Sequence, residues 1–161
     1  MSSPGFGPES ATVPRLPWRH RPLGARLAVG AMAPLLLGTG AFVWMGMPGE
    51  VRGAFSGLQT LTLVLFLVVA LLVLNGVFRT AVHADTAGLT VVNVYRVRRL
   101  EWAQVLRVNL RRGDAWAVLD TDDGTTVYVM AIQGSDGDRA RRAARQLRQL
   151  VDQQTTTSTN D

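Results

Sequence analysis

The hydrophobic positions of the chain gather into two long runs in its first half. Residues 27–47 and 54–78 hold 21 and 25 residues without a charged side chain, and only the six residues 48–53 separate them. At ~1.5 Å per residue, helices of these lengths measure ~31 and ~37 Å, against a membrane hydrocarbon core of ~30 Å. The two runs therefore predict two transmembrane helices joined by a short outer turn.

The first run has two other interpretations, a buried helix of a water-soluble protein or a secretory signal. Pro34 and several glycines dilute its apolar character, and an arginine-rich segment precedes it. The second run has no such alternative, because residues 61–74 are Leu, Val, Phe and Ala throughout, apart from Thr62. A chain of 161 residues has no core large enough to bury a helix that is apolar on every side.

After residue 79 the period of the pattern changes to alternation of apolar and polar residues, which is typical of strands with one wet face. The pattern predicts about six short strands, at 81–84, 89–92, 96–100, 106–110, 116–121 and 126–132. Within them, Val97, Leu100 and Leu106 are expected to point inward. Turn residues lie between the strands, and Asp122-Asp123-Gly124-Thr125 predicts a hairpin. Residues 101–104 interrupt the alternation as a single helical turn that places Trp102 in the core.

The end of the chain returns to helical spacing. Ala140, Ala143, Ala144, Leu147, Leu150 and Val151 fall on one face, with arginines opposite, and Ser135 with Asp138 resembles a capping box. Residues 79–154 are thus expected to form a small, mainly β domain in which this helix covers one end of a curved antiparallel sheet. Trp102, Trp116 and Leu147 are its predicted core residues. Residues 1–26, with five prolines, and 155–161 are predicted to be disordered tails.

The charged residues predict the orientation of the helices. All 17 basic residues are arginines, and they flank the two runs, whereas the connecting turn holds only Arg52. By the positive-inside rule both termini are cytoplasmic and the protein lies in the cell (inner) membrane. The candidates for contact with anionic lipid headgroups are Arg19, Arg21, Arg26, Arg79, Arg96 and Arg98. For the last two, an alternative is a solvated strand face that prevents sheet-to-sheet pairing.

The residue types available for chemistry are few. The chain has no Cys, no Lys and only two histidines, so thiolate, Schiff-base and P-loop lysine chemistry are excluded. We predict a non-enzymatic protein with no cofactor and no metal site. Nucleic acid is not an expected partner, because acidic residues are interleaved with the arginines of the second half.

Two sets of residues resemble chemical sites and have simpler explanations. Asp120, Asp122 and Asp123 suggest a calcium loop, but the twelfth position counted from Asp120 is Ala131 and not Glu, so a hairpin turn is favoured. His83 and Asp85 share one side of a strand, yet the sequence supplies no third member for a catalytic set. Asp136 and Asp138 are interpreted as acids that complement the dipole of the last helix.

The basic strand followed by Leu100-Glu101-Trp102 and then by Val105-Leu106-Arg107-Val108 resembles the bacterial pleckstrin-homology-like (PH) domain. Residues 24–153 together resemble the small two-span PH-domain membrane proteins of high-GC bacteria, of the low molecular weight protein antigen type. The resemblance implies a partly open barrel of two roughly orthogonal sheets, capped by a C-terminal helix and serving for binding or as a scaffold. The turn that binds inositol phosphates in eukaryotic PH domains corresponds to the acidic 85–88 here, which argues against that ligand.

These observations lead to two hypotheses. In the first, a non-enzymatic inner-membrane protein presents a PH-like interaction module at the cytoplasmic surface, where it binds a protein partner or a second copy of itself. In the second, the chain is a small accessory subunit of a transporter or of an envelope-synthesis complex, and its partner recognises the transmembrane helices.

Overall fold

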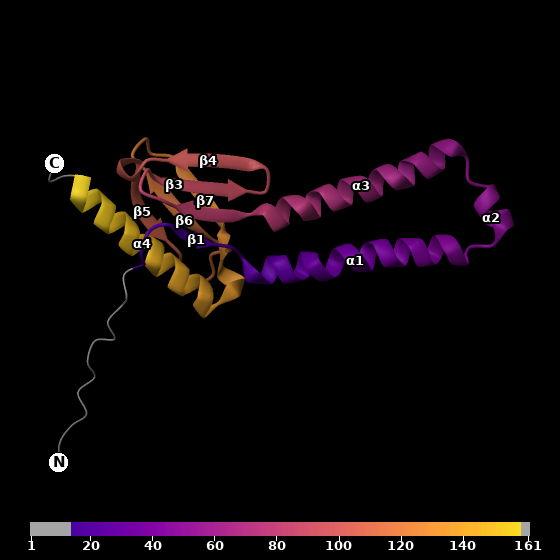
Figure 1. Ribbon diagram of the computed structural model, residues 1–161, viewed down its shortest axis with the longest axis horizontal. Coiled ribbons are helices and arrows are strands. Elements are labelled where there is room, and N and C mark those ends of the chain that lie inside the picture. Colours follow the sequence, from indigo (N-terminus) through magenta and orange to yellow (C-terminus); the bar gives the residue numbers. More distant parts are fainter. Residues whose placement is uncertain (1–13, 159–161) are drawn as a thin grey trace, which may run out of the picture.

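Two long helices extend side by side from a domain of strands and one further helix (Figure 1). The computed structural model describes residues 14–158 of the chain. The long helices are α1 (Leu23–Gly46) and α3 (Gly57–Arg79), and the short helix α2 (Gly49–Gly53) lies at the far end between them. Both long helices are long and apolar enough to cross a membrane. The predicted pair of long apolar helices is therefore confirmed.

The ends of these helices differ from the predicted ones for local reasons. The helix α3 begins at Gly57 because Ser56 caps it: the Ser56 hydroxyl accepts the N–H of Gln59, and the Gln59 side chain accepts the N–H of Ser56. The helix α1 begins at Leu23, four residues before the uncharged run, since an arginine such as Arg26 fits easily into a helical first turn.

The strands form two antiparallel sheets that are not closed into a barrel. The first has the order β1-β2-β3-β4 and the second the order β5-β6-β7. The strands of the first sheet are β1 (Trp18–His20), β2 (Ala81–Ala84), β3 (Leu89–Asn93) and β4 (Arg96–Leu100). Those of the second are β5 (Val105–Asn109), β6 (Trp116–Thr121) and β7 (Thr126–Gln133).

The helix α4 (Asp138–Ser158) lies along the open end of the sheets, next to β5 and the 3-10 turn η1 (Trp102–Gln104) (Figure 1). The predicted capping box at its start is wrong. Ser135 belongs to another 3-10 turn, η2 (Gly134–Asp136), and Gly137, with a φ of 58°, separates that turn from the helix. The helix also runs on through 155–158, which were predicted to be a tail, and 159–161 lie outside the described residues.

The predicted disordered tail 1–26 contains ordered structure. Trp18, Arg19 and His20 form β1, paired antiparallel with Ala84, His83 and Val82 of β2. The strand forms because the edge of β2 offers unpaired backbone groups and because Leu16 and Trp18 pack against the domain core. A strand of three residues is too short for the sequence pattern to reveal it. Residues 1–13 lie outside the described residues.

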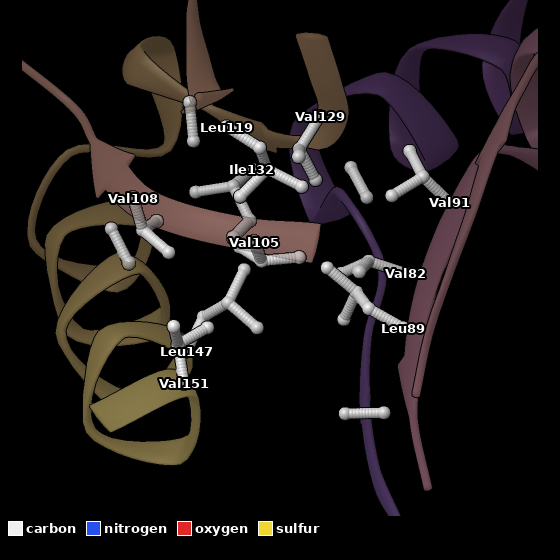
Figure 2. Packing of buried hydrophobic residues seen from close by; sticks show 14 of the residues in the cluster. Val82, Leu89, Val91, Val105, Val108, Leu119, Val129, Ile132, Leu147 and Val151 are labelled. Carbon is white, nitrogen blue, oxygen red and sulfur yellow. The ribbon is translucent and has the colours of Figure 1, made fainter. Parts of the chain in front are cut away.

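The core lies between the two sheets and α4. Val82, Leu89 and Val91 of the first sheet face Leu119, Val129 and Ile132 of the second, while Leu147 and Val151 of α4 cover one end (Figure 2). Trp102 is 6% exposed, and its indole N–H donates to the carbonyl of Asp85 at 2.9 Å. Leu147 is fully buried.

Three residues predicted to point inward lie at the surface. Trp116 is 37% exposed, because the pairing of β6 with β7 shifts register between Trp116 and Ala117, and its ring packs edge-to-face on Tyr128. Leu106 is exposed because a similar irregularity in β5 leaves it outside the ladder between Val105 and Arg107. Val97 is opposite Val92, on the outer face of the first sheet.

Candidate functional site at the root of the helical hairpin

The turn between β3 and β4 docks on α3. Its two central residues, Val94 and Tyr95, lie against Gly76, which is the buried residue of that helix. A Cβ atom on Gly76 would lie 2.5 Å from Val94 Cγ1 and 2.7 Å from Tyr95 Cε2. The Tyr95 hydroxyl donates to the carbonyl oxygen of Leu72 at 2.5 Å. A glycine notch in the apolar helix thus receives the tip of a domain hairpin.

The backbone of this tip is strained. Val94 has a φ of 58°, in the left-handed region that a β-branched residue rarely adopts. Its N–H donates to the hydroxyl of Thr80, at 3.3 Å, and Thr80 is buried where α3 passes into β2. Strain of this kind persists only where the surroundings fix the conformation. The hairpin tip is therefore held from two sides, by the notch in α3 and by Thr80.

The N-terminal end of α1 and the C-terminal end of α3 join the domain and are called here the roots of the helical hairpin. The root of α1 is capped by a residue that is distant in the sequence. The carboxylate of Asp136 accepts the N–H of Leu23 at 3.1 Å and that of Gly24 at 3.2 Å. The first turn of α1 has no acidic residue of its own, so Asp136 supplies the negative charge that the helix dipole favours there. The prediction that Asp136 serves the start of the last helix is wrong: it lies in η2 and caps α1.

Further contacts fasten the segment before α1. The indole N–H of Trp18 donates to Gln146 of α4 at 3.3 Å, and the Trp18 ring stacks on His20 with centroids 5.9 Å apart. The guanidinium of Arg26 lies 4.4 Å from the ring centroid of Phe78 and so joins the roots of α1 and α3. The helical hairpin is consequently connected to the domain at the start of α1 and at the end of α3.

A groove of about 520 Å³ opens beside the docked tip, between β4 and the free edge of β7. The side-chain amide of Asn93 closes part of this seam, since it donates to the carbonyl of Tyr128 at 2.6 Å and accepts the N–H of Met130 at 3.1 Å. The Asn93 side chain thereby makes the hydrogen bonds to β7 that the backbone of a paired strand would make. The groove is lined by Asn93, Val94, Tyr95, Arg96, Arg98, Thr126, Val127, Tyr128 and Met130.

The register of the first sheet shows where the arginines of β4 point. Arg98 is opposite Val91 and Arg96 is opposite Asn93, and directly opposed residues share one face of a sheet. Val91 is buried in the core, and Asn93 reaches across to the second sheet. Arg96 and Arg98 therefore lie on the core-side face of β4, and both are exposed in the groove.

The structure gathers some of the predicted headgroup arginines and leaves others apart. Arg26 lies at the start of α1 and Arg79 at the end of α3. The guanidinium of Arg79 is 6.0 Å from the ring centroid of Tyr95, and Tyr95 is the residue before Arg96. Arg19 lies on the edge strand β1 opposite His83, and Arg21 is half-buried between β1 and α1. Contact of all six arginines with lipid stays a prediction.

The acidic residues near the hairpin turns serve the turns themselves. The Asp85 carboxylate accepts the N–H groups of Ala87 and Gly88, and Asp123 accepts the Thr121 hydroxyl at 2.6 Å and the Thr125 N–H at 2.9 Å. These hydrogen bonds lower the pKa of Asp123 to about 2. Within residues 14–158, no three His, Cys, Asp or Glu side chains stand together as a metal-binding group. The structure thus confirms the hairpin turn that the sequence favoured over a calcium loop.

Both histidines lie in or beside β1, since His20 belongs to this strand and His83 is paired with Arg19 of it. Burial, the nearby Arg139 and, in the opposite direction, Asp136 act on His20, with a net lowering of its pKa. Partial burial and Arg19 also lower the pKa of His83, against the effect of Asp85. Within the described residues, the buried atoms His20 Nε2 and Arg21 Nε have no hydrogen-bond partner. Sequence reasoning missed His20 as part of the fold because it lay in a presumed tail.

Comparison with known proteins shows what the domain is similar to. Residues 79–150 match the family model described as a bacterial PH domain. Uncharacterized proteins of Mycobacterium bovis and of two strains of Mycobacterium tuberculosis are 37% identical to the chain over 73 residues, which is 45% of this chain and 47% of each relative. The chain therefore spans about half the length of the curated relatives that it matches. No solved structure matches the chain significantly.

The matched segment coincides with the structural division. It begins at the last residue of α3 and ends within α4, so it covers β2 to β7 and most of the final helix. The two apolar helices and β1 lie outside it. The fold and the comparison together show a segment similar to bacterial PH domains, preceded by two helices that are long and apolar enough to span a membrane.

Proposed function

We propose that the chain is a non-enzymatic protein of the bacterial cytoplasmic membrane that presents its PH-like domain as an interaction module at the cytoplasmic surface. The surface of the two long helices is the observation that carries this proposal. None of the residues of α1 is buried, and large apolar side chains are exposed on all sides, with Phe42 80% and Phe66 70% exposed. Such a surface far exceeds the apolar patches of water-soluble monomers, so lipid is its natural solvent.

The positions of the arginines support the orientation. Arg26 and Arg79 lie at the ends of the helices that join the domain, whereas the far end of the hairpin holds Arg52 together with Glu50. Basic residues beside transmembrane helices favour the cytoplasmic side. Both termini and the domain are then cytoplasmic, and Arg19, Arg21, Arg26 and Arg79 attract the anionic headgroups of that leaflet.

The manner of attachment suggests what the domain is for. A flexible tether would suffice to keep a module near the membrane, but here Asp136 caps α1, and Val94 and Tyr95 dock on α3. The domain is therefore held in one orientation relative to the bilayer, with the same faces turned toward the cytoplasm. A fixed presentation favours the binding of a protein partner or of a second copy of the chain.

Two fusions test the proposed membrane placement. Green fluorescent protein attached after Asp161 is expected to fluoresce, and alkaline phosphatase attached at the same position is expected to be inactive. Both fusions should sediment with membranes and require detergent for extraction. Active phosphatase at this position, or protein that remains in the supernatant without detergent, would contradict the proposal.

A second candidate function is that of an accessory subunit recognised through its spans. One observation favours it: Gly30, Gly38 and Gly40 of α1 have nothing within 4 Å of the position of an added Cβ, so α3 does not fill the space beside any of them. Small residues of this kind let another transmembrane helix approach closely. Loss of a co-purifying partner from a Gly38→Leu variant, with retention by Leu37→Ala, would favour this function over that of the cytoplasmic module.

A further inference from the structure

The groove between β4 and β7 carries positive charge where a sheet normally carries apolar side chains. Arg96 and Arg98 share their face of the first sheet with Val91, a core residue, and both are exposed in the groove. Within residues 14–158, neither groove arginine forms an ion pair with a carboxylate. Two guanidinium groups thus line one open space, and neither is held in an ion pair.

The geometry of these two side chains suits one tetrahedral anion. Residues two apart on a strand are separated by ~6.6 Å, so two long side chains on the same face can reach a single ligand. A guanidinium group presents several N–H donors in a planar fork that matches phosphate oxygens. The hydroxyl-bearing side chains of Tyr95, Thr126 and Tyr128 line the same groove, and none of its lining residues is acidic. Asp123 does not line the groove, but its carboxylate interacts electrostatically with Arg98. Thr121 and Thr125 donate hydrogen bonds to the Asp123 carboxylate.

We propose that this groove is a binding site for a phosphate-bearing anion, with Arg96 and Arg98 as its principal ligands. The turn 85–88 corresponds to the turn that binds inositol phosphates in eukaryotic PH domains, and it is not part of this groove. The ligand has two possible sources, the headgroup of an anionic phospholipid or a soluble phosphate ester. The lipid source rests on the proposed function, since the docked tip at Gly76 then places Tyr95 and Arg96 at headgroup level, beside the apolar surface of α3.

The competing explanation is that the arginines only protect the edge of β4 from pairing with another strand. Such a role needs positive charge at the edge but no ligand, and it does not need two arginines of the same parity in one groove. The two explanations differ in whether a phosphate compound binds with an affinity that depends on these two side chains.

The test uses the full chain in neutral maltoside micelles and native mass spectrometry to count bound ligands. The probes are dioctanoyl phosphatidylglycerol, glycerol 3-phosphate, which lacks the acyl chains, and dioctanoyl phosphatidylcholine. The variants are Arg96→Gln/Arg98→Gln and, as a control with the same loss of charge, Arg142→Gln/Arg145→Gln, whose arginines are exposed on α4. Because all four side chains are at the surface, every variant is expected to fold, and its melting temperature verifies this.

The groove variant is expected to bind phosphatidylglycerol about thirtyfold more weakly than the unsubstituted chain, while the α4 variant binds it normally. Equal dependence of glycerol 3-phosphate binding on the groove arginines would identify a soluble phosphate ester as the ligand, and dependence of the lipid alone would identify a headgroup. Binding of both probes that is the same in the groove variant and the unsubstituted chain would overturn the proposal. Micelles have no sides, so a failure of the proposed topology would not alter this result.

Discussion

The helices α3 and α4 have similar lengths, 23 and 21 residues, and opposite relations to their surroundings. Leucines of α3 such as Leu61 and Leu65 face outward, and Gly76 is the residue that this helix buries. In α4 the apolar residues Leu147 and Leu150 are fully buried, and the arginines are outside. Leucine side chains thus form part of the folded core in α4 and remain on the outer surface in α3.

In the proposed membrane placement, the two halves of the chain are stabilised by different solvents. The domain removes apolar surface from water, and its stability depends on side chains that fill the space between the sheets and α4. The helical hairpin keeps its apolar surface outside and depends on backbone hydrogen bonds and on its attachment at the roots. Substitutions of one residue type should therefore have unequal effects in the two regions.

The largest difference is expected for leucine truncation. Leu147→Ala should lower the free energy of unfolding of the domain by about 3 to 5 kcal/mol, because it leaves a cavity at a fully buried site. Leu61→Ala, at the surface of α3, should change it by about 0.5 kcal/mol or less. Urea unfolding of the full chain in detergent, followed by tryptophan fluorescence, measures both values. Equal losses would show that Leu61 of α3 is buried as deeply as Leu147 of α4, and a loss only for Leu61→Ala would show that α3 and not α4 is the core helix.

A second truncation tests the core from the side of η1. Trp102→Ala should cost about 3 to 5 kcal/mol, because it removes a buried indole and leaves the carbonyl of Asp85 without its donor. A variant that has no cooperative unfolding transition at all would agree with this value in so small a domain. An unchanged urea midpoint would contradict the placement of the indole.

The junction of the two regions should respond to bulk at one glycine and not at another. Gly76→Val is expected to destabilise the chain by about 1 to 3 kcal/mol, because its side chain would overlap Val94 and Tyr95. Gly40→Val is the matched control on α1, where nothing lies within 4 Å of the added Cβ. Hydrogen exchange of the amides of 93–97 should rise in the first variant only. Similar exchange in both variants would mean that the hairpin tip does not dock on α3.

The cap of α1 should have a smaller effect. Asp136→Ala removes the acceptor of two amide groups and a favourable charge, which should cost about 1 kcal/mol. Asp136→Asn keeps an acceptor and should recover part of this stability. Faster hydrogen exchange at Leu23 and Gly24 would accompany the loss, and unchanged exchange in Asp136→Ala would sever the proposed link between η2 and α1.

The smallest expected effect is a dependence of stability on pH through His20. Its folded pKa lies below the ordinary 6.5, so the unfolded chain takes up the proton first as the pH falls. Stability is then complete above the ordinary value and decreases as the pH falls through the folded pKa. Between about pH 7.5 and 5.5, His20→Gln should reduce the fall in melting temperature more than His83→Gln does, because His20 is the more deeply buried. An unaltered fall in His20→Gln would contradict this origin.

Periodicity predicted the elements of this protein well and their tertiary roles less well. The long apolar runs, the hairpin at 122–125, the burial of Trp102 and the amphipathic α4 all follow from local patterns. The strand β1 did not, because three residues are too few to show alternation and their partner, β2, is distant in the sequence. The exposed Trp116 and Leu106 depend on register irregularities, which alternation cannot reveal.

The candidate site shows the same limit. The sequence identified Arg96 and Arg98 as candidates for headgroup contact, but only the register with Val91 and Asn93 shows that they share the core-side face. The cap by Asp136 joins residues more than a hundred positions apart, and no local pattern predicts it. The notch at Gly76 was hidden among ordinary glycines of an apolar helix.

The most direct test of the account is the sidedness of the chain in the membrane, and the lack of any native cysteine makes it simple. Glu50→Cys places a thiol in α2, and Arg145→Cys places one on the exposed face of α4. A membrane-impermeant maleimide applied to intact spheroplasts is expected to label the first variant, and to label the second only after the membrane is broken. Labelling of Arg145→Cys in intact spheroplasts, with Glu50→Cys protected, would reverse the topology, and labelling of neither or both would remove the helical hairpin from the membrane.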